Sequence, residues 1–513
     1  MAIVLAALPY NLFELDRYTF PKELVLHACA FGAAVVCTVR ARRIPLFLID
    51  ALLAGFLVMG LLSSLEATNG WLAFRALSVS VSSVVLFWCA RSVARGGLAG
   101  PLLAGLAGAV VLGASTGLAQ AYGLVDSSLA SLTRAPGGTF GNRNFMAHLA
   151  AIGLPALLLV TLQTRRRAAL MLGATGVGLV AAALILSRSR AAWLGAAISV
   201  VFLGIEGLVI GRLWLDDHIR RRALQLTAAA LIGIVAAITI PNRLNWRSES
   251  PYLDSLAGVA NYKEGSGRGR LIQYGNTLKM AQANPLLGVG PGNWPVHYPR
   301  YMTPGDPSYH VHDFIPTNPW PSSDWMAMLS ERGVPATLLL LGVGAALAFG
   351  AWARIRRGSG HLPALTDLTL IATLIAVAVV GVFDAVLLLP VPSFFAWAIA
   401  GALASSARPI RELVLTPGAR SRAVMIVAGI GAIVVLRSGA QIAAMSLYSS
   451  GGRGAVEWAQ RLDPGSYRIH TLLAFTWLDR GRCKSAVPHA RAARDLFPNY
   501  PAPRQILRAC GSR

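Results

Sequence analysis

Charged residues, and acidic residues above all, are scarce in this sequence. Asp, Glu, Lys and Arg make up 13% of its 513 residues, about half the share usual in a soluble domain. Hydrophobic residues make up 55%, and the mean hydropathy is +0.56. A soluble fold of this length would need far more polar surface to cover it. The composition therefore excludes an ordinary soluble domain and indicates a protein of the lipid bilayer.

The sequence also lacks patterns that would tie its excess positive charge to a familiar soluble ligand. The formal net charge is +23, yet no basic helix or aromatic-basic pattern favours nucleic acid. No Cys/His spacing suggests zinc. Cys29, Cys37 and Cys89 lie in apolar segments and behave as small hydrophobes. Cys483 and Cys510 lie in a polar tail, where the sequence fits a disulfide or two free thiols equally well.

Apolar residues come in runs of about 20, the length that a helix needs to cross hydrocarbon. The chain is therefore expected to be all-α, a polytopic helical membrane protein with about 12 transmembrane helices. The stretch 1–13 would be a short or incomplete further segment, because it lacks the basic start and the cleavage site of a signal peptide. The predicted spans are 23–40, 44–66, 71–93, 98–122, 145–163, 167–186, 190–211, 223–240, 335–353, 365–389, 391–407 and 423–445.

Arginine is distributed unevenly between the two sides of these spans. One set of connections holds nineteen arginines, whereas the opposite short connections hold only Arg188 and Arg190. Cytoplasmic loops of membrane proteins collect Lys and Arg, so the arginine-rich side is predicted to be cytoplasmic. The nineteen are Arg40, Arg42, Arg43, Arg91, Arg95, Arg165, Arg166, Arg167, Arg212, Arg220, Arg221, Arg222, Arg354, Arg356, Arg357, Arg408, Arg411, Arg420 and Arg422.

All long polar segments then fall on the outer side. The loop 241–334 is too long for a simple connector, and loops of that length are usually functional. We assign 1–445, including this loop, to a transmembrane domain and 446–513 to a helical outer tail. Residues 452–498 resemble a tetratricopeptide-type helical hairpin, although only one or two repeats fit, fewer than a free-standing array needs.

Four outer segments carry candidate functional residues. Arg188 and Arg190 are exceptions to the positive-inside trend. For Arg188 we favour a side chain that snorkels to the membrane surface, and for Arg190 we favour contact with an anion. The glycine-rich start of 265–294 places Arg268 and Arg270 beside free backbone N–H groups that suit an anion, or else forms an amphipathic helix on the membrane. In 309–333, His310 and His312 could act as bases or be ordinary surface histidines.

The fourth segment, 137–159, is an Asn/Gly turn that enters a membrane helix, with His148 expected to be a packed helix residue. Arg75, Asp384 and Arg437 lie inside spans and could pair structurally or line a cavity. No Asp-x-Asp occurs in the outer loops, so a metal-held diphosphate site is not indicated there. A pyrophosphate on this side would have to be neutralised by arginines.

In their order and predicted topology, these motifs resemble the O-antigen ligase and O-antigen polymerase superfamily of bacterial inner membranes. The motifs are GTFGNRN (138–144), SRSRAAWLG (187–195), the 270–294 segment ending NPLLGVGPGNW, and DWMAMLSERG (324–333). The resemblance covers about 1–445, and a tetratricopeptide-like tail also occurs in some members of the superfamily.

The resemblance implies a metal-independent, inverting glycosyltransferase without a cofactor. Its donor would be a glycan on undecaprenyl pyrophosphate, presented at the periplasmic face. Its acceptor would be lipid A-core in a ligase, a lipid-linked repeat unit in a polymerase, or a protein hydroxyl in a related branch. Arg190 and Arg270 match the family's pyrophosphate-contacting arginines. The candidate substrate-binding residues are Arg188, Arg268, Asn142, Asn293, Trp294 and Asp324.

The sequence departs from the family at one position. Members usually carry a His-Asn pair where this chain has Ser322 and Ser323, and that His is the family's candidate base. His312 or His310, or else Asp324 or Asp313, would have to serve here, or the activity is lost or changed. Ligase, polymerase and non-catalytic assembly protein therefore stay open. A flippase is disfavoured by the large outer loop and by the lack of a hydropathy repeat.

Overall fold

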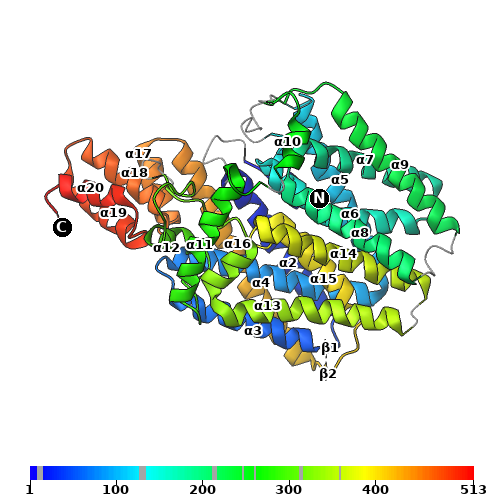
Figure 1. Cartoon of the computed structure of the whole chain (residues 1–513). Coiled ribbons are helices and arrows are strands. Elements are labelled where there is room, and N and C mark those ends of the chain that lie inside the picture. The colour runs from blue at the N-terminus through cyan, green and yellow to red at the C-terminus, as the bar shows by residue number, and fades with distance from the viewer. Residues whose placement is uncertain are drawn as a thin grey trace.

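Helices build almost the whole molecule, as the hydropathy predicts (Figure 1). The computed structural model describes residues 1–8, 16–125, 135–210, 217–244, 246, 248–258, 261–310, 316–357 and 360–512. The elements of the membrane domain are α1 (Ala2–Leu5), α2 (Asp16–Arg40), β1 (Arg43–Leu46), α3 (Leu48–Leu65), α4 (Gly70–Val93), η1 (Ala94–Leu98), α5 (Ala99–Ala121), η4 (Gly138–Phe140), α6 (Arg143–Gln163), α7 (Arg167–Ser187), α8 (Arg190–Ile210), α9 (Asp217–Thr239), α13 (Asp324–Arg356), α14 (His361–Phe383), α15 (Pro390–Ala404), β2 (Arg411–Val414) and α16 (Pro417–Ser449).

The remaining helices lie in the outer loop and the tail. The elements of the outer loop are α10 (Pro251–Ala257), α11 (Gly265–Ala283), α12 (Trp294–His297) and η5 (Tyr298–Arg300), and those of the tail are α17 (Arg453–Leu462), α18 (Tyr467–Leu478), α19 (Cys483–Leu496) and α20 (Pro501–Ala509).

The described residues contain nine helical segments long and apolar enough to cross a membrane. One of them, Gly70–Ala121, consists of two helices, because η1 joins α4 to α5 with a kink at Gly97. The apolar helices α8 and α15 occupy the two other predicted spans. The prediction of an all-α polytopic membrane protein is therefore confirmed.

One predicted span end is wrong for a structural reason. The span 365–389 ends as a helix at Phe383, because Asp384 is extended and the next residues form a turn. The backbone N–H groups of Val386, Leu387 and Leu388 in this turn all point at the carboxylate of Asp324. The sequence also predicts a short helix that ends at Gly333, and the structure has a break at that residue: inside α13, Gly333 has φ of 80° and ψ of 176°, between the short helix and the span. Hydropathy alone could not show the turn after Asp384, since it is as apolar as a helix.

The stretch 1–13 does not form a span within its described part, 1–8. Its helix α1 has only four residues, and residues 9–15 lie outside the described part of the chain. The helix α2 begins at Asp16, earlier than the predicted residue 23, so that Lys22 and Glu23 lie in its first turns. Lys22 donates to the Thr139 carbonyl at 2.7 Å, which ties the helix start to the turn before α6.

Described arginines of the predicted cytoplasmic side hold neighbouring helices together at one end of the bundle. Arg91 makes two hydrogen bonds to Asp50 at 2.7 and 3.1 Å, and Arg354 makes two to Asp367 at 2.9 and 2.8 Å. At the same end, β1 pairs antiparallel with β2, which joins two connections that both belong to the arginine-rich set. This pairing agrees with the predicted topology.

The tail packs against the opposite end of the bundle, where the outer loop also lies (Figure 1). Asn69, at the start of α4, donates to the Gly465 carbonyl at 3.2 Å. Arg437 of α16 pairs with Asp463 of the tail. Asn499 donates to the Val296 carbonyl of the outer loop at 2.8 Å. The tail is thus fixed to both α4 and the loop.

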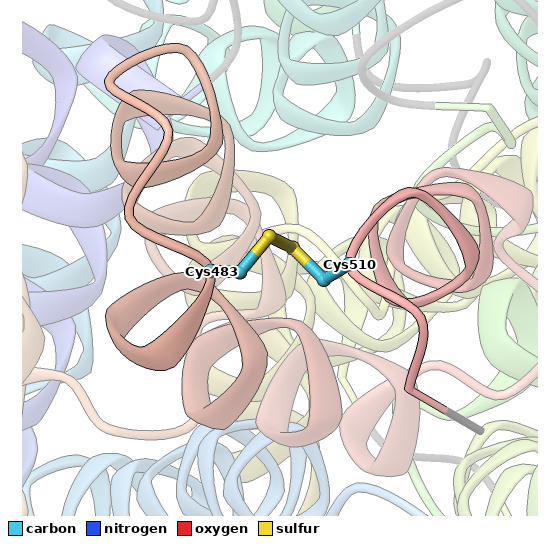
Figure 2. The surroundings of a disulfide bond; sticks show 2 residues. All are labelled: Cys483 and Cys510. Atoms are coloured by element: carbon cyan, nitrogen blue, oxygen red, sulfur yellow. A yellow bond between two sulfur atoms is a disulfide. The ribbon is translucent and has the colours of Figure 1, made fainter.

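A disulfide closes the last part of the tail. Cys483, at the start of α19, is bonded to Cys510, just after α20 (Figure 2). Of the two arrangements that the sequence left open, the structure has the disulfide. Such bonds persist in oxidising compartments, which agrees with a tail outside the cytoplasm.

Candidate functional site

Two arginines predicted from distant segments lie in one narrow cleft at the outer end of the bundle. Arg190 of α8 and Arg270 of α11 line it together with Asn261, Tyr262 and Phe383. We call this the arginine cleft; its remaining lining residues are Ala191, Leu194, Gly258 and Gly267. The cleft has a volume of about 30 Å³, and none of these described lining residues is acidic. It therefore concentrates positive charge at a surface that lacks a carboxylate to neutralise it.

The tight turn between α7 and α8 places Arg190 at this cleft. Arg188 ends α7 in the left-handed conformation, with φ of 51°, which reverses the chain within two residues. The Ser189 carbonyl accepts the backbone N–H of Trp193 at 2.9 Å, and the Trp193 indole donates back to the Leu184 carbonyl at 2.6 Å. Arg190 is consequently the first residue of α8, at a helix N-terminus that favours anions.

The guanidinium of Arg190 is held only by neutral groups among the described residues. It donates to the Gly258 carbonyl and to the Ser266 hydroxyl at the start of α11. A Cβ at position 258 would lie 2.8 Å from Arg190 Nη1, so a side chain there would displace the end of the guanidinium. Within the described chain, neither Arg190 nor Arg270 forms an ion pair with a carboxylate. Both charges are therefore available to an external anion.

The helix α11 presents Arg270 to the same cleft and fixes its own position through Tyr274. The Tyr274 hydroxyl lies 2.7 Å from the Ser322 carbonyl oxygen and 2.6 Å from that of Val382, and it donates to one of them. Burial raises the pKa of Tyr274, which keeps the phenol protonated as a donor. Arg270 is close enough to Arg190, Tyr274 and His148 to interact electrostatically with each.

Behind the arginines lies a buried histidine–carboxylate pair that the sequence did not bring together. His148 of α6 is fully buried, and its Nε2 lies 3.6 Å from Asp384 Oδ2. Asn144, one turn earlier, donates to the same oxygen at 3.4 Å. Neither nitrogen of His148 has a hydrogen-bond partner among the described residues. In the sequence, a membrane-embedded histidine four residues after an asparagine was the signal for a functional pair at this place. Its partner could not be identified there, because Asp384 comes from a remote span.

The serines at the family's His-Asn positions have structural contacts. The Ser322 N–H donates to Gln273 Oε1 at 2.6 Å, and the Ser323 hydroxyl donates to the Gly381 carbonyl at 3.0 Å. The next residue, Asp324, is buried and accepts backbone N–H groups from the 386–388 turn. Since its oxygens are occupied in this way, Asp324 is a poor candidate for the base, although it fixes the turn that follows Asp384.

The NPLLGVGPGNW segment (284–294) packs around the kink of α13 and forms hydrogen bonds with it. The backbone N–H groups of Gly292 and Trp294 donate to the buried Glu331 carboxylate at 2.8 and 3.2 Å. At the kink Gly333 has φ of 80°, and a Cβ there would lie 2.2 Å from the Leu286 carbonyl oxygen. The side chain of Asn293 is also used structurally, because it exchanges hydrogen bonds with the backbone of Asn69 at 2.8 and 3.1 Å.

Other candidate substrate-binding residues lie outside the cleft. Trp294 is fully buried, and its indole donates to the Thr277 hydroxyl at 3.0 Å. Asn142 caps α6 by accepting the Asn144 N–H at 2.9 Å. Arg188 donates to the Ser255 hydroxyl at 2.8 Å and lies over the Trp246 ring, so it holds α10. Arg268 is an exposed residue in the first turns of α11, two positions before Arg270.

One of the two candidate base histidines lies among the described residues. His310 is exposed, and its backbone N–H donates to the Pro316 carbonyl at 2.7 Å. His312 and Asp313 lie outside the described residues. No group of three or more His, Cys, Asp or Glu in the described part of the chain is arranged to hold a metal ion.

A second and larger cavity lies between the membrane domain and the tail. Its volume is about 440 Å³, and its walls come from α2, α4, the outer loop, α13, the 384–389 turn and the start of α18. We call it the tail cavity. Acidic and basic side chains both line it: Asp16, Glu23, Glu331, Arg75, Arg332 and Arg468. It differs from the arginine cleft in size and in the balance of its charge.

The fold and these sites define a polytopic helical membrane protein with a cationic cleft and a structured outer loop at one end. Residues 175–341 match the family model described as O-antigen ligase. The match contains Arg190, the outer loop and the kink of α13, and it supports a place for the chain in the O-antigen ligase superfamily. No curated protein matches the chain. A membrane glycan ligase or polymerase role is thus supported, while the tetratricopeptide-like character of the tail stays a prediction.

Proposed function

We propose that this protein transfers a glycan from undecaprenyl pyrophosphate to an acceptor at the periplasmic face of the bacterial inner membrane. The reaction that we propose is O-antigen ligation to lipid A-core. The observation that carries the proposal is the arginine cleft, which Arg190 and Arg270 line together and in which no described lining residue is a carboxylate. A diphosphate is the anion of the donor, and arginine recognises phosphate oxygens with paired, directional donors.

The two arginines would act on the leaving group. In an inverting transfer, an acceptor hydroxyl attacks the anomeric carbon, the bond to the diphosphate oxygen breaks, and negative charge develops on the diphosphate. Arg190 would exchange its neutral partners, the Gly258 carbonyl and the Ser266 hydroxyl, for this anion. Fixed cationic donors aimed at developing charge lower the free energy of the transition state strongly. Metal-independent chemistry is part of the proposal.

The acceptor hydroxyl must also lose a proton during the transfer. His310 and His312 remain our proposed bases, since both belong to the segment that precedes α13. Asp324 is disfavoured because backbone N–H groups occupy its oxygens. His148 is fully buried beside Arg270, so we propose for His148 and Asp384 a role in holding the floor of the cleft.

An O-antigen polymerase is the second candidate on the same scaffold. The donor contacts would be the same, and only the acceptor would change to another lipid-linked repeat unit. The serines at positions 322 and 323 keep a third candidate open, a non-catalytic protein of polysaccharide assembly. The retention of both arginines in one cleft favours an enzyme over this third candidate.

Expression in a strain that lacks its own ligase tests these candidates together. A ligase should restore the lipopolysaccharide ladder on a gel, and Arg270→Ala should remove it at unchanged protein level. A polymerase should instead lengthen the glycan on the lipid carrier, with the same dependence on Arg270. If purified protein with its own donor and acceptor produces neither product, the enzymatic proposal is wrong.

A further inference from the structure

We propose that the tail cavity is a binding site for the neutral sugar residues of the acceptor glycan, and that the C-terminal tail forms one wall of it. That the bound glycan is an acceptor rests on the proposed function, but the sugar-binding site itself does not depend on it. The cavity has about 440 Å³, within the range of roughly 300–1,000 Å³ that small-molecule sites occupy.

The charges around the tail cavity cancel one another. Arg75 makes two hydrogen bonds to Glu23 at 2.8 and 2.7 Å, and Arg468 of the tail pairs with Asp16. Paired in this way, the groups present oxygens and N–H donors without a net field that would select an anion. A ligand rich in hydroxyl groups, which both donate and accept, fits such walls better than a diphosphate does.

Arg332 adds a buried charge to the same wall. Its side chain is 2% exposed, and its Nη2 donates to the Ser80 hydroxyl at 2.6 Å. Its Nε and Nη1 have no hydrogen-bond partner among the described residues. Both atoms are enclosed, and Nη1 faces Gly60 and the Phe56 ring of α3, so Arg332 contributes its charge to this wall rather than free donors.

Apolar and aromatic surface completes the cavity. Trp320 of the outer loop and Tyr467 of the tail both line it, together with Leu72 and Leu388. Aromatic rings with a polar edge give a flat apolar face next to a hydrogen-bonding group. The C–H face of a pyranose ring can pack on such a surface while its hydroxyl groups reach the paired charges.

The position of the tail cavity suits an acceptor. Trp320, on its wall, lies 6.1 Å from Phe145 between ring centroids, and Phe145 lies 6.2 Å from His148. Leu388 belongs to the turn that follows Asp384, and Phe383, the residue before Asp384, lines the arginine cleft. An acceptor held there would lie next to the donor site, as a bimolecular transfer requires.

The tail is a firm wall because three contacts hold it. Arg437 pairs with Asp463, and Asn69 donates to the Gly465 carbonyl at 3.2 Å. A Cβ at position 465 would lie 2.1 Å from Trp71 Cβ, so the tail backbone touches α4 directly. Tyr467 and Arg468 follow within three residues and are therefore placed against the cavity.

Binding of free sugar to the purified full chain in nanodiscs tests the inference. The probes are two oligosaccharides prepared from the lipopolysaccharide of the source strain, the core oligosaccharide and the repeat unit, and affinity is measured by calorimetry. Leu388→Trp fills the cavity and should weaken binding of the preferred probe at least tenfold. Tyr467→Leu removes the tail's aromatic face and should weaken it severalfold. Leu338→Trp is the matched control, because Leu338 is 60% exposed on a membrane helix away from the cavity.

The outcomes separate this inference from the proposed function. Arg270→Ala should abolish transfer yet leave sugar affinity unchanged, and excess inorganic pyrophosphate should not displace the sugar. Sugar binding that responds to Leu388→Trp, in a protein that transfers nothing, would support the cavity and refute the enzyme. If neither oligosaccharide binds, or if folded Leu388→Trp and Tyr467→Leu both bind like the unchanged protein, the inference is wrong whatever the transfer activity.

Discussion

The arginine cleft and the tail cavity lie at the same end of the helix bundle and both contain arginines, but different groups face those arginines. In the tail cavity, Arg75 and Arg468 are held by Glu23 and Asp16. In the cleft, the guanidinium of Arg190 meets only a carbonyl and a hydroxyl among the described residues. A buried charge that has a partner mainly stabilises the fold, whereas one without an anionic partner is available to a ligand. The same residue type thus has two physical roles a short distance apart.

The largest expected effect is on transfer activity in the cleft. Arg190→Ala should lower kcat about 10²–10³-fold, the cost of removing one fixed donor to developing charge. The KM for the acceptor should stay unchanged, because the acceptor is held elsewhere. Steady-state kinetics with purified protein measure both constants. Lys279→Ala is the matched control, an exposed cation on α11 outside the cleft.

The second effect is on stability and concerns an acidic residue of the tail cavity. Glu331→Ala leaves the buried N–H groups of Gly292 and Trp294 without an acceptor, at about 1–3 kcal/mol each. Thermal unfolding in detergent should therefore begin several degrees lower. Glu331→Gln keeps one acceptor oxygen and should cost less. If a stably folded Glu331→Gln protein loses transfer activity, the Glu331 carboxylate takes part in the reaction. That outcome would contradict the contrast between the two sites.

A smaller effect is expected from the disulfide of the tail. Cys483→Ser with Cys510→Ser opens a loop with a sequence separation of 27, which is worth about 3–4 kcal/mol in an isolated domain. Here the tail is also held by α4 and the outer loop, so the loss should be confined to α19 and α20. Hydrogen exchange should rise in these two helices and not in α11. Equal loosening of α11 would show that the two regions are not independent.

The smallest effect is a pH dependence of the tail. Burial, and then the charge of His489, lowers the pKa of His470 below its ordinary value, and burial does the same for His489. Protonation therefore favours the unfolded tail, and stability that is complete above about pH 6.5 is lost as the pH falls below it. The nearby carboxylates of Asp463 and Glu457 oppose this shift and limit it.

Hydrogen exchange of 467–500 measured at pH 7.5 and pH 5 checks this prediction. Exchange should be faster at the lower pH, by a factor of a few, and His470→Gln should reduce the difference. The affinity of the tail cavity for sugar should fall in parallel, whereas donor binding in the cleft should not. A tail that is equally protected at both pH values would contradict the prediction.

The arginine pair could be predicted from the sequence, but its surroundings could not. Arg190 follows from the SRSRAAW turn and Arg270 from the glycine-rich start of α11, both local patterns. Asp324 looked like an available acid until the structure showed backbone N–H groups from the 386–388 turn on its oxygens. His148 looked like a packing residue, and its neighbour Asp384 only becomes visible once α6 and the end of α14 are side by side.

The sequence by itself indicated the helical spans and the placement of both long segments on one side of them, and it predicts an orientation. These properties follow from helix length in hydrocarbon and from arginine counts, and they need no knowledge of neighbours in space. Tertiary structure decided where α14 ends, which arginines are neutralised, and that Asn144 meets Asp384 from 240 positions away. It also decided that the tail closes a cavity, because a cavity consists of surfaces from distant segments and no single segment contains it.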